Sequence, residues 1–107
     1  MPDQALPMVA FSGAVELRNI EDAFEKVKKA CDEGLGCEID LSGVTDLDLT
    51  LVQLIESARR GAAAGGKVVR LAAPAAGVVR EALRRGGFLS DPPDARTQFW
   101  LGQKGSN

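Results

Sequence analysis

The 107-residue chain contains no histidine and no tyrosine. Without histidine the chain cannot form a Ser-His-Asp or Cys-His catalytic triad, and it cannot supply the histidine ligands of the usual catalytic zinc sites. It also has no apolar stretch that approaches the ~20 residues of a membrane-spanning helix. If the chain is an enzyme, its chemistry works without imidazole.

Cysteine is scarce as well: the chain has two, Cys31 and Cys37. Their spacing matches neither a CxxC motif nor a zinc site. Cys31 falls on the apolar face of a predicted helix and Cys37 at the start of a predicted strand, so we expect two small buried hydrophobic residues. The first residues show no basic segment followed by an apolar run, the pattern of a secretory signal peptide, and the expected location is cytoplasmic.

Basic residues are few in the first half of the chain. Residues 1–58 carry 4 basic and 12 acidic side chains, whereas residues 59–107 carry 9 basic and 3 acidic ones. An alternating fold would bring the halves together and largely neutralise these charges; alternatively, a dipolar surface steers a partner of mixed charge. The acidic balance, without a basic stripe interleaved with aromatics, disfavours nucleic-acid binding.

Apolar periodicity and glycine stops predict alternating strands and helices. The predicted strands cover about residues 8–11, 37–41, 67–71 and, as a last edge strand, 98–101; the predicted helices cover about 20–33, 48–64 and 74–85. This order predicts an α/β fold with a mostly parallel central sheet of about four strands and three to four helices packed on it. We expect a single domain over 1–107, with its core at 6–101 and a frayed tail at 102–107.

Local patterns refine these elements. Ile20, Phe24, Val27 and Cys31 recur at helical spacing and predict the buried face of the first helix. Pro74 suits the first helical position. Phe88, after Gly86 and Gly87, is placed to pack back on the last predicted helix. The segment 99–101 (Phe-Trp-Leu) completes the sheet, packs across the helices or forms an edge for dimerisation.

One motif is misleading. Residues 61–67, GAAAGGK, have the spacing of a phosphate-binding loop. The following residue is Val68, where magnesium coordination needs Ser or Thr, and the segment leaves a helix to enter a strand. A phosphate-binding loop leaves a strand and opens a helix. We therefore interpret it as the glycine-terminated end of an alanine-rich helix.

The carboxylates Asp40, Asp46 and Asp48 suggest a metal or acid–base site. Each also has a structural explanation: Asp40 belongs to the alternating pattern of a strand, Asp46 lies in the turn that follows, and Asp48 is suited to cap the next helix. Thr50 then lies near the second helical position with its hydroxyl on the solvent side. A phosphate there would meet the positive end of the helix dipole; otherwise Thr50 is a surface residue that helps to begin the helix.

Three segments together resemble the STAS domain, the fold of bacterial anti-sigma factor antagonists. Residues 12–17 (SGAVEL) are similar to its strand-ending G-x-(L/V)-(D/E) segment, and residues 40–48 (DLSGVTDLD) to its D-(L/F)-S-x-V-x-x-(hydrophobic)-D segment. Residues 71–88 are similar to its last strand, helix and glycine-hydrophobic close. The resemblance implies the STAS fold, a parallel sheet with packed helices.

In the antagonist members of that family, a serine just after the conserved aspartate is phosphorylated by a partner kinase. The corresponding residue here is Thr50, two positions after Asp48. Leu49 and Leu51 stand where the antagonists have serine and glycine. In this respect the chain is more similar to STAS domains found beside chemotaxis genes or in lipid-trafficking complexes.

The resemblance therefore implies a non-enzymatic regulatory protein of bacterial signalling, of anti-anti-sigma or chemotaxis-associated type. The expected partner is a histidine-kinase-fold serine/threonine kinase or an anti-sigma factor, and the expected switch is phosphorylation of Thr50. We expect a monomer or weak homodimer without cofactor, metal, nucleic acid or membrane insertion. The alternative is a nucleotide- or lipid-linked binding module, such as a lipid-trafficking complex subunit. The predicted partner-binding residues lie in the loop 44–47 and at the start of the second helix: Val44, Thr45, Asp46, Leu47, Asp48, Leu49, Thr50 and Gln53.

Overall fold

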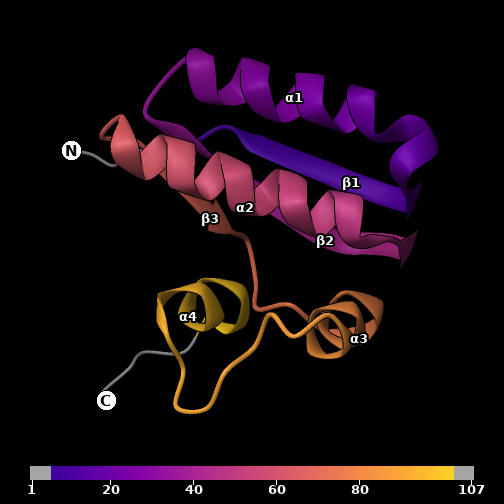
Figure 1. Cartoon of the computed structure of the whole chain (residues 1–107). Helices are drawn as coiled ribbons and strands as arrows, with labels where there is room; N and C mark the ends of the chain where they lie inside the picture. The colour runs from indigo at the N-terminus through magenta and orange to yellow at the C-terminus, as the bar shows by residue number, and fades with distance from the viewer. Residues whose placement is uncertain (1–5, 103–107) are drawn as a thin grey trace.

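Three parallel strands form the central sheet of the computed structural model, which describes residues 6–102 (Figure 1). They are β1 (Met8–Val15), β2 (Gly36–Leu47) and β3 (Val68–Leu71), hydrogen-bonded in the order β1-β2-β3. The predicted α/β class and parallel sheet are confirmed. The expectation of about four strands is wrong for the described residues, because the segment expected to form the last strand is helical.

Helices follow each strand. They are η1 (Leu17–Asn19, a 3-10 turn), α1 (Ile20–Asp32), α2 (Leu49–Ala64), α3 (Gly77–Arg85) and α4 (Ala95–Leu101). Helix α1 connects β1 to β2, α2 connects β2 to β3, and the two helices contact each other over the sheet (Figure 1). Helices α3 and α4 contact β2 and β3 and lie on the side of α2 away from α1.

Burial alternates along the strands, which shows that helices cover one sheet face. Val9, Phe11, Ile39 and Val69 are buried, whereas their neighbours Ala10 and Arg70 are exposed. Glu38 and Asp40 alternate with the buried residues of β2, and both are half-buried. Glu38 forms an ion pair with Arg70 on the neighbouring strand, with 3.1 Å between Oε2 and Nε.

Strand β2 is longer than expected. The strand predicted over 37–41 runs to Leu47, because β1 continues to pair with it. Ser12 lies opposite Gly43, and a Cβ on Gly43 would be 3.0 Å from the Cβ of Ser12. Glycine therefore allows the two strands to approach at this point. The predicted loop 44–47 is part of β2.

Residues 98–101, expected as an edge strand, lie in α4. Asp94 caps this helix by accepting a hydrogen bond from the backbone N–H of Thr97 at 2.8 Å. Trp100 is fully buried, and its carbonyl oxygen accepts a hydrogen bond from the N–H of Ala75 at 2.7 Å. Of the three interpretations of this segment, packing among the helices is the one observed.

Two expectations about helix positions are also wrong. Helix α3 begins at Gly77, not at Pro74, because the chain after β3 first runs without helical structure past α4. Phe24 is 48% exposed, since α1 turns its small residues Ala23 and Ala30 toward the core. The end of α3 matches the prediction: Phe88 N–H donates to Leu83 O at 3.0 Å after Gly87, whose φ is +77°.

The expected frayed tail over 102–107 lies outside the described residues except for Gly102. Within residues 6–102, no helix combines the length and the apolar character needed to cross a membrane.

Candidate functional site

The start of α2 is organised by one carboxylate. Asp48 leaves β2 in an extended conformation, and its Oδ1 accepts a hydrogen bond from the backbone N–H of Thr50 at 3.1 Å. The Thr50 hydroxyl donates to the same oxygen. An aspartate at this position satisfies an N–H group that has no partner within the helix. Asp48 is thus the cap that the sequence predicted.

The second oxygen of this carboxylate connects a different part of the chain. Asp48 Oδ2 accepts a hydrogen bond from the backbone N–H of Leu17 at 3.0 Å, so the carboxylate joins the turn η1 to the start of α2. These hydrogen bonds lower the pKa of Asp48, and the largest contribution comes from the Thr50 hydroxyl. The carboxylate is therefore negatively charged at neutral pH.

Two leucines next to this cap are exposed. Leu49 is 44% exposed and Leu17 is 66% exposed. The Leu49 side chain also approaches the end of α3, because a Cβ on Gly86 would lie 3.1 Å from its Cδ2. We call Leu17, Leu49, Thr50 and Gln53 the α2-start surface. It combines exposed apolar groups with a hydroxyl, a pairing that suits contact with another protein.

The other predicted site residues take different positions. Val44 is 7% exposed and belongs to the core, so little of its side chain is available to a partner. Leu47 and Asp48 are half-buried, whereas Thr45 and Asp46 are exposed beside them. Thr50 is half-buried, with its hydroxyl directed at Asp48 rather than free in solvent.

Sequence reasoning missed Leu17. It is an apolar residue in a polar stretch, but it is separated from Asp48 by 31 positions and no local pattern links the two. The parallel pairing of Val15 with Leu47 brings these segments together at the carboxyl ends of their strands. Carboxyl ends of parallel strands are where binding surfaces of open α/β sheets commonly form.

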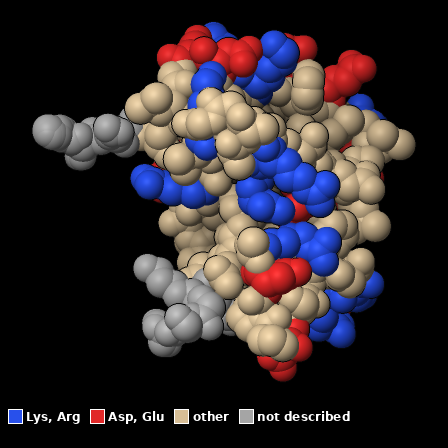
Figure 2. All heavy atoms as spheres, turned by 60° about the vertical axis from the view of Figure 1, so that its left-hand side comes forward, with Lys and Arg blue, Asp and Glu red and all other residues tan. Residues whose placement is uncertain are grey.

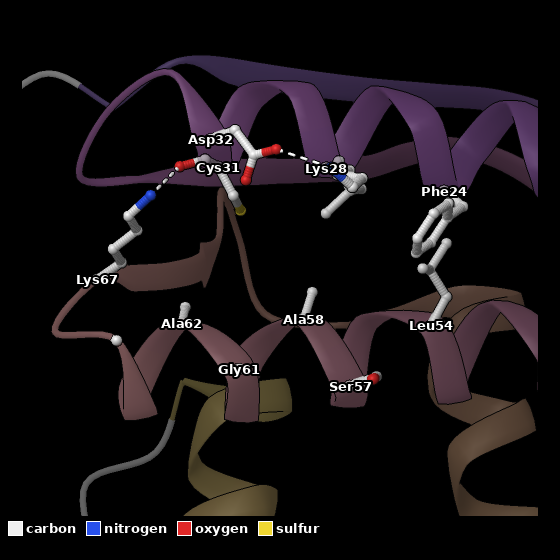
Figure 3. Close-up of a pocket in the computed structure, with 12 residues that line it drawn as sticks. Phe24, Lys28, Cys31, Asp32, Leu54, Ser57, Ala58, Gly61, Ala62 and Lys67 are labelled. Atoms are coloured by element: carbon white, nitrogen blue, oxygen red, sulfur yellow. Dashed lines mark hydrogen bonds and ion pairs between the residues drawn. The ribbon is translucent and has the colours of Figure 1, made fainter.

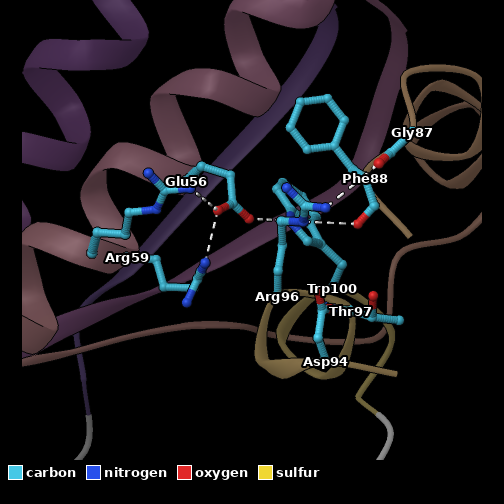
Figure 4. A network of polar contacts seen from close by, with 9 residues as sticks. Glu56, Arg59, Gly87, Phe88, Asp94, Arg96, Thr97 and Trp100 are labelled. Carbon is cyan, nitrogen blue, oxygen red and sulfur yellow. Dashed lines mark hydrogen bonds and ion pairs between the residues drawn. The ribbon is translucent and has the colours of Figure 1, made fainter. Parts of the chain in front are cut away.

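A second polar cluster joins α2 to α4 (Figure 4). Glu56 is buried on α2, and its Oε2 accepts a hydrogen bond from Trp100 Nε1 at 2.6 Å. Arg59 donates to Glu56 Oε1 at 2.7 Å. Nearby, Arg96 Nε donates to the carbonyl oxygen of Phe88 at 3.0 Å. The paired and buried carboxylate fixes the position of α4 rather than offering a free reactive group.

Charges of the two halves of the chain meet in the fold. Glu38 of β2 pairs with Arg70 of β3, whereas Glu56 pairs with Arg59 and lies 3.7 Å from Arg60 within one helix, α2. Figure 2 nevertheless shows a face on which Lys and Arg side chains gather across the middle. The opposite charges of the two halves of the chain are therefore only partly paired. Across residues 6–102, no three side chains of His, Cys, Asp or Glu gather as a metal ion would need.

A groove of about 430 Å³ separates α1 from α2 (Figure 3). Its walls are mostly apolar and small, with Phe24 and Leu54 facing each other near one end. At the other end, Lys67 Nζ donates to the carbonyl oxygen of Cys31 at 2.7 Å. The groove is separate from the α2-start surface.

Comparison of the sequence with models of known protein families and with curated proteins gives no match.

Proposed function

We propose that this chain is a non-enzymatic regulatory module of the STAS type that docks a protein partner through the α2-start surface. The observation that supports this proposal is the arrangement around Asp48, whose carboxylate holds Thr50 and the exposed Leu17 close to the exposed Leu49. The three-stranded parallel sheet with helices is compatible with such a fold.

The same arrangement gives a physical basis for a phosphorylation switch at Thr50. The Thr50 hydroxyl donates a hydrogen bond to Asp48, and a phosphoryl group would replace the hydroxyl hydrogen with a group that carries close to two negative charges. Repulsion between phosphate and carboxylate would separate the two side chains. Asp48 would then release the N–H of Leu17, and the α2-start surface would change both its charge and its shape.

The proposed partner is a histidine-kinase-fold serine/threonine kinase or an anti-sigma factor. The first experiment incubates the purified chain with such kinases, ATP and magnesium, and measures intact mass. We expect a gain of about 80 Da for one phosphoryl group, and no gain for Thr50→Val. Thr45→Val is the matched control, because Thr45 is a neighbouring exposed threonine outside the α2-start surface, and it should still be modified.

The second experiment measures affinity for the same partner. Leu49→Asp should raise Kd at least about 10-fold, equivalent to about 1.4 kcal/mol, because a charge would enter an apolar contact. Leu35 is also exposed, but it precedes β2, whereas the start of α2 follows the other end of this strand, so Leu35→Asp is the control. Equal loss with both variants would contradict the docking surface. An unmodified Thr50 with every kinase, together with wild-type binding by Thr50→Glu, would contradict the switch.

The alternative is a nucleotide- or lipid-linked module, and the observation that favours it is the groove between α1 and α2. A ligand held there would raise the melting temperature on addition of the ligand. Substitution of Ala58, which lines the groove, by Trp should abolish that rise while leaving kinase affinity unchanged. Leu49→Asp should leave the rise intact, so the two functions are separable.

A further inference from the structure

The two cysteines lie on consecutive elements and meet in the fold. Cys31 is in the last turn of α1, and Cys37 is the second residue of β2. Their Sγ atoms are 3.5 Å apart, and both thiols are free. The expectation that both are small buried residues is correct for Cys37 but incomplete for Cys31, which is half-buried. Two thiols in contact, one of them accessible, can react with each other after oxidation of one.

The surroundings of the two sulfurs are unequal. Cys37 is 0% exposed, and burial, followed by its hydrogen bond with Cys31, raises the pKa of the Cys37 thiol to about 12. Cys31 lines the groove between α1 and α2, and its side chain points into it (Figure 3). Lys28, Asp32 and Lys67 are the charged residues that line the same groove. An oxidant of small size can therefore reach Cys31 before Cys37.

We propose that Cys31 and Cys37 form a redox-active pair, in which hydrogen peroxide oxidises Cys31 and Cys37 then closes an intramolecular disulfide. In the first step the Cys31 thiolate attacks one peroxide oxygen, the O–O bond breaks, and hydroxide leaves to become water. In the second step Cys37 sulfur attacks the Cys31 sulfenic sulfur. The S–O bond breaks, and the Cys37 proton goes to the departing hydroxide. Two thiols and one peroxide thus give one disulfide and two waters.

The disulfide would tie the end of α1 to the start of β2. It would also draw Cys31 sulfur away from the groove toward the sheet. Oxidation therefore changes the shape of the groove directly, independently of the α2-start surface.

The test treats the folded chain with hydrogen peroxide near neutral pH and follows intact mass. We expect the wild type to lose about 2 Da as the two thiol hydrogens are removed, and dithiothreitol to restore the original mass. Cys31→Ser should lose its remaining thiol, Cys37, at least about tenfold more slowly than the wild type loses its two thiols, because the Cys37 sulfur is buried and rarely ionised. Cys37→Ala should stop at the sulfenic acid, which dimedone traps on Cys31.

Far-UV circular dichroism checks that each variant is folded before treatment. Oxidation of Cys31→Ser at the wild-type rate would overturn the assignment of Cys31 as the attacking thiol. A wild-type chain that gains oxygen without losing two hydrogens, or that forms covalent dimers instead, would overturn the pair itself.

Discussion

The hydrogen bond between Trp100 and Glu56 offers a quantitative test of how α4 is held. The indole N–H donates to a carboxylate on α2 at 2.6 Å, across 44 positions of sequence. Both groups are buried, so neither can exchange its partner for water without moving. The same carboxylate accepts a hydrogen bond from Arg59. We predict that breaking this contact weakens the whole fold, not α4 alone.

A hydrogen bond to a charged group contributes about 1.5–3 kcal/mol to stability. Glu56→Met keeps the length of the side chain but removes both acceptor oxygens, so we expect a loss of about 3 kcal/mol because the bond from Arg59 is lost as well. Trp100→Phe removes the donor and part of a fully buried ring, with an expected loss of about 2–3 kcal/mol. Each kilocalorie lowers the melting temperature of a domain of this size by about 4–8 °C.

A double-mutant cycle isolates the pair. Urea unfolding is followed by far-UV circular dichroism, because Trp100 is the single tryptophan and its fluorescence disappears in the variant. The coupling energy between the two substitutions should be about 2 kcal/mol. The control cycle uses the exposed ion pair of Lys28 and Asp32, whose Nζ and Oδ2 are 3.0 Å apart. Exposed pairs four residues apart on a helix couple by about 0.3–0.5 kcal/mol.

A coupling energy for Glu56 and Trp100 no larger than that of the control pair would refute the reasoning. The loss of stability in each single variant would then come from lost side-chain volume and lost burial of apolar surface. The contact between α2 and α4 would then not depend on this hydrogen bond.

Two further predictions concern the backbone and pH. Gly36→Ala should unfold the chain or lower its stability by more than about 3 kcal/mol in a urea titration, because its Cβ would lie 1.6 Å from the carbonyl oxygen of Val68. Gly34→Ala is the control and should stay folded in the same titration, because a Cβ there has nothing within 4 Å. The pKa of Asp48 is lowered, chiefly by the Thr50 hydroxyl. The contribution of this carboxylate to folding stability is therefore present above the unfolded-state pKa of about 3.9 and disappears as pH falls through the folded-state pKa. Asp48→Asn keeps a good capping side chain, so its stability deficit should be largest near neutral pH and vanish in acid; a deficit independent of pH would contradict the charge argument.

Much of the fold could be predicted because its determinants are local. The spacing of apolar residues, and the glycines that follow each apolar pattern, predicted α1 and α2 within a few residues. Asp48 as a cap depends on the residue itself and on the helix that starts beside it. The end of α3, with Gly87 at positive φ and Phe88 after it, is likewise a property of consecutive residues.

The candidate site could be predicted in part. Asp48, Leu49 and Thr50 adjoin one another in sequence, and the prediction placed them together at the start of a helix. That Val44 is buried depends on the continued pairing of β1 with β2, which a local turn pattern at Ser42 could not reveal. Leu17 joins the surface for the same reason.

The alternation of strands and helices, the α/β class and the capped start of α2 follow from interactions between near neighbours in the sequence. Contacts between distant residues place Trp100 in a helix, bury Glu56 against its indole ring and bring the sulfurs of Cys31 and Cys37 together. The last four residues before Gly102 have a pattern compatible with either strand or helix. Packing of a large indole against a buried carboxylate selects the helix, because burial energy from distant residues outweighs a weak local preference.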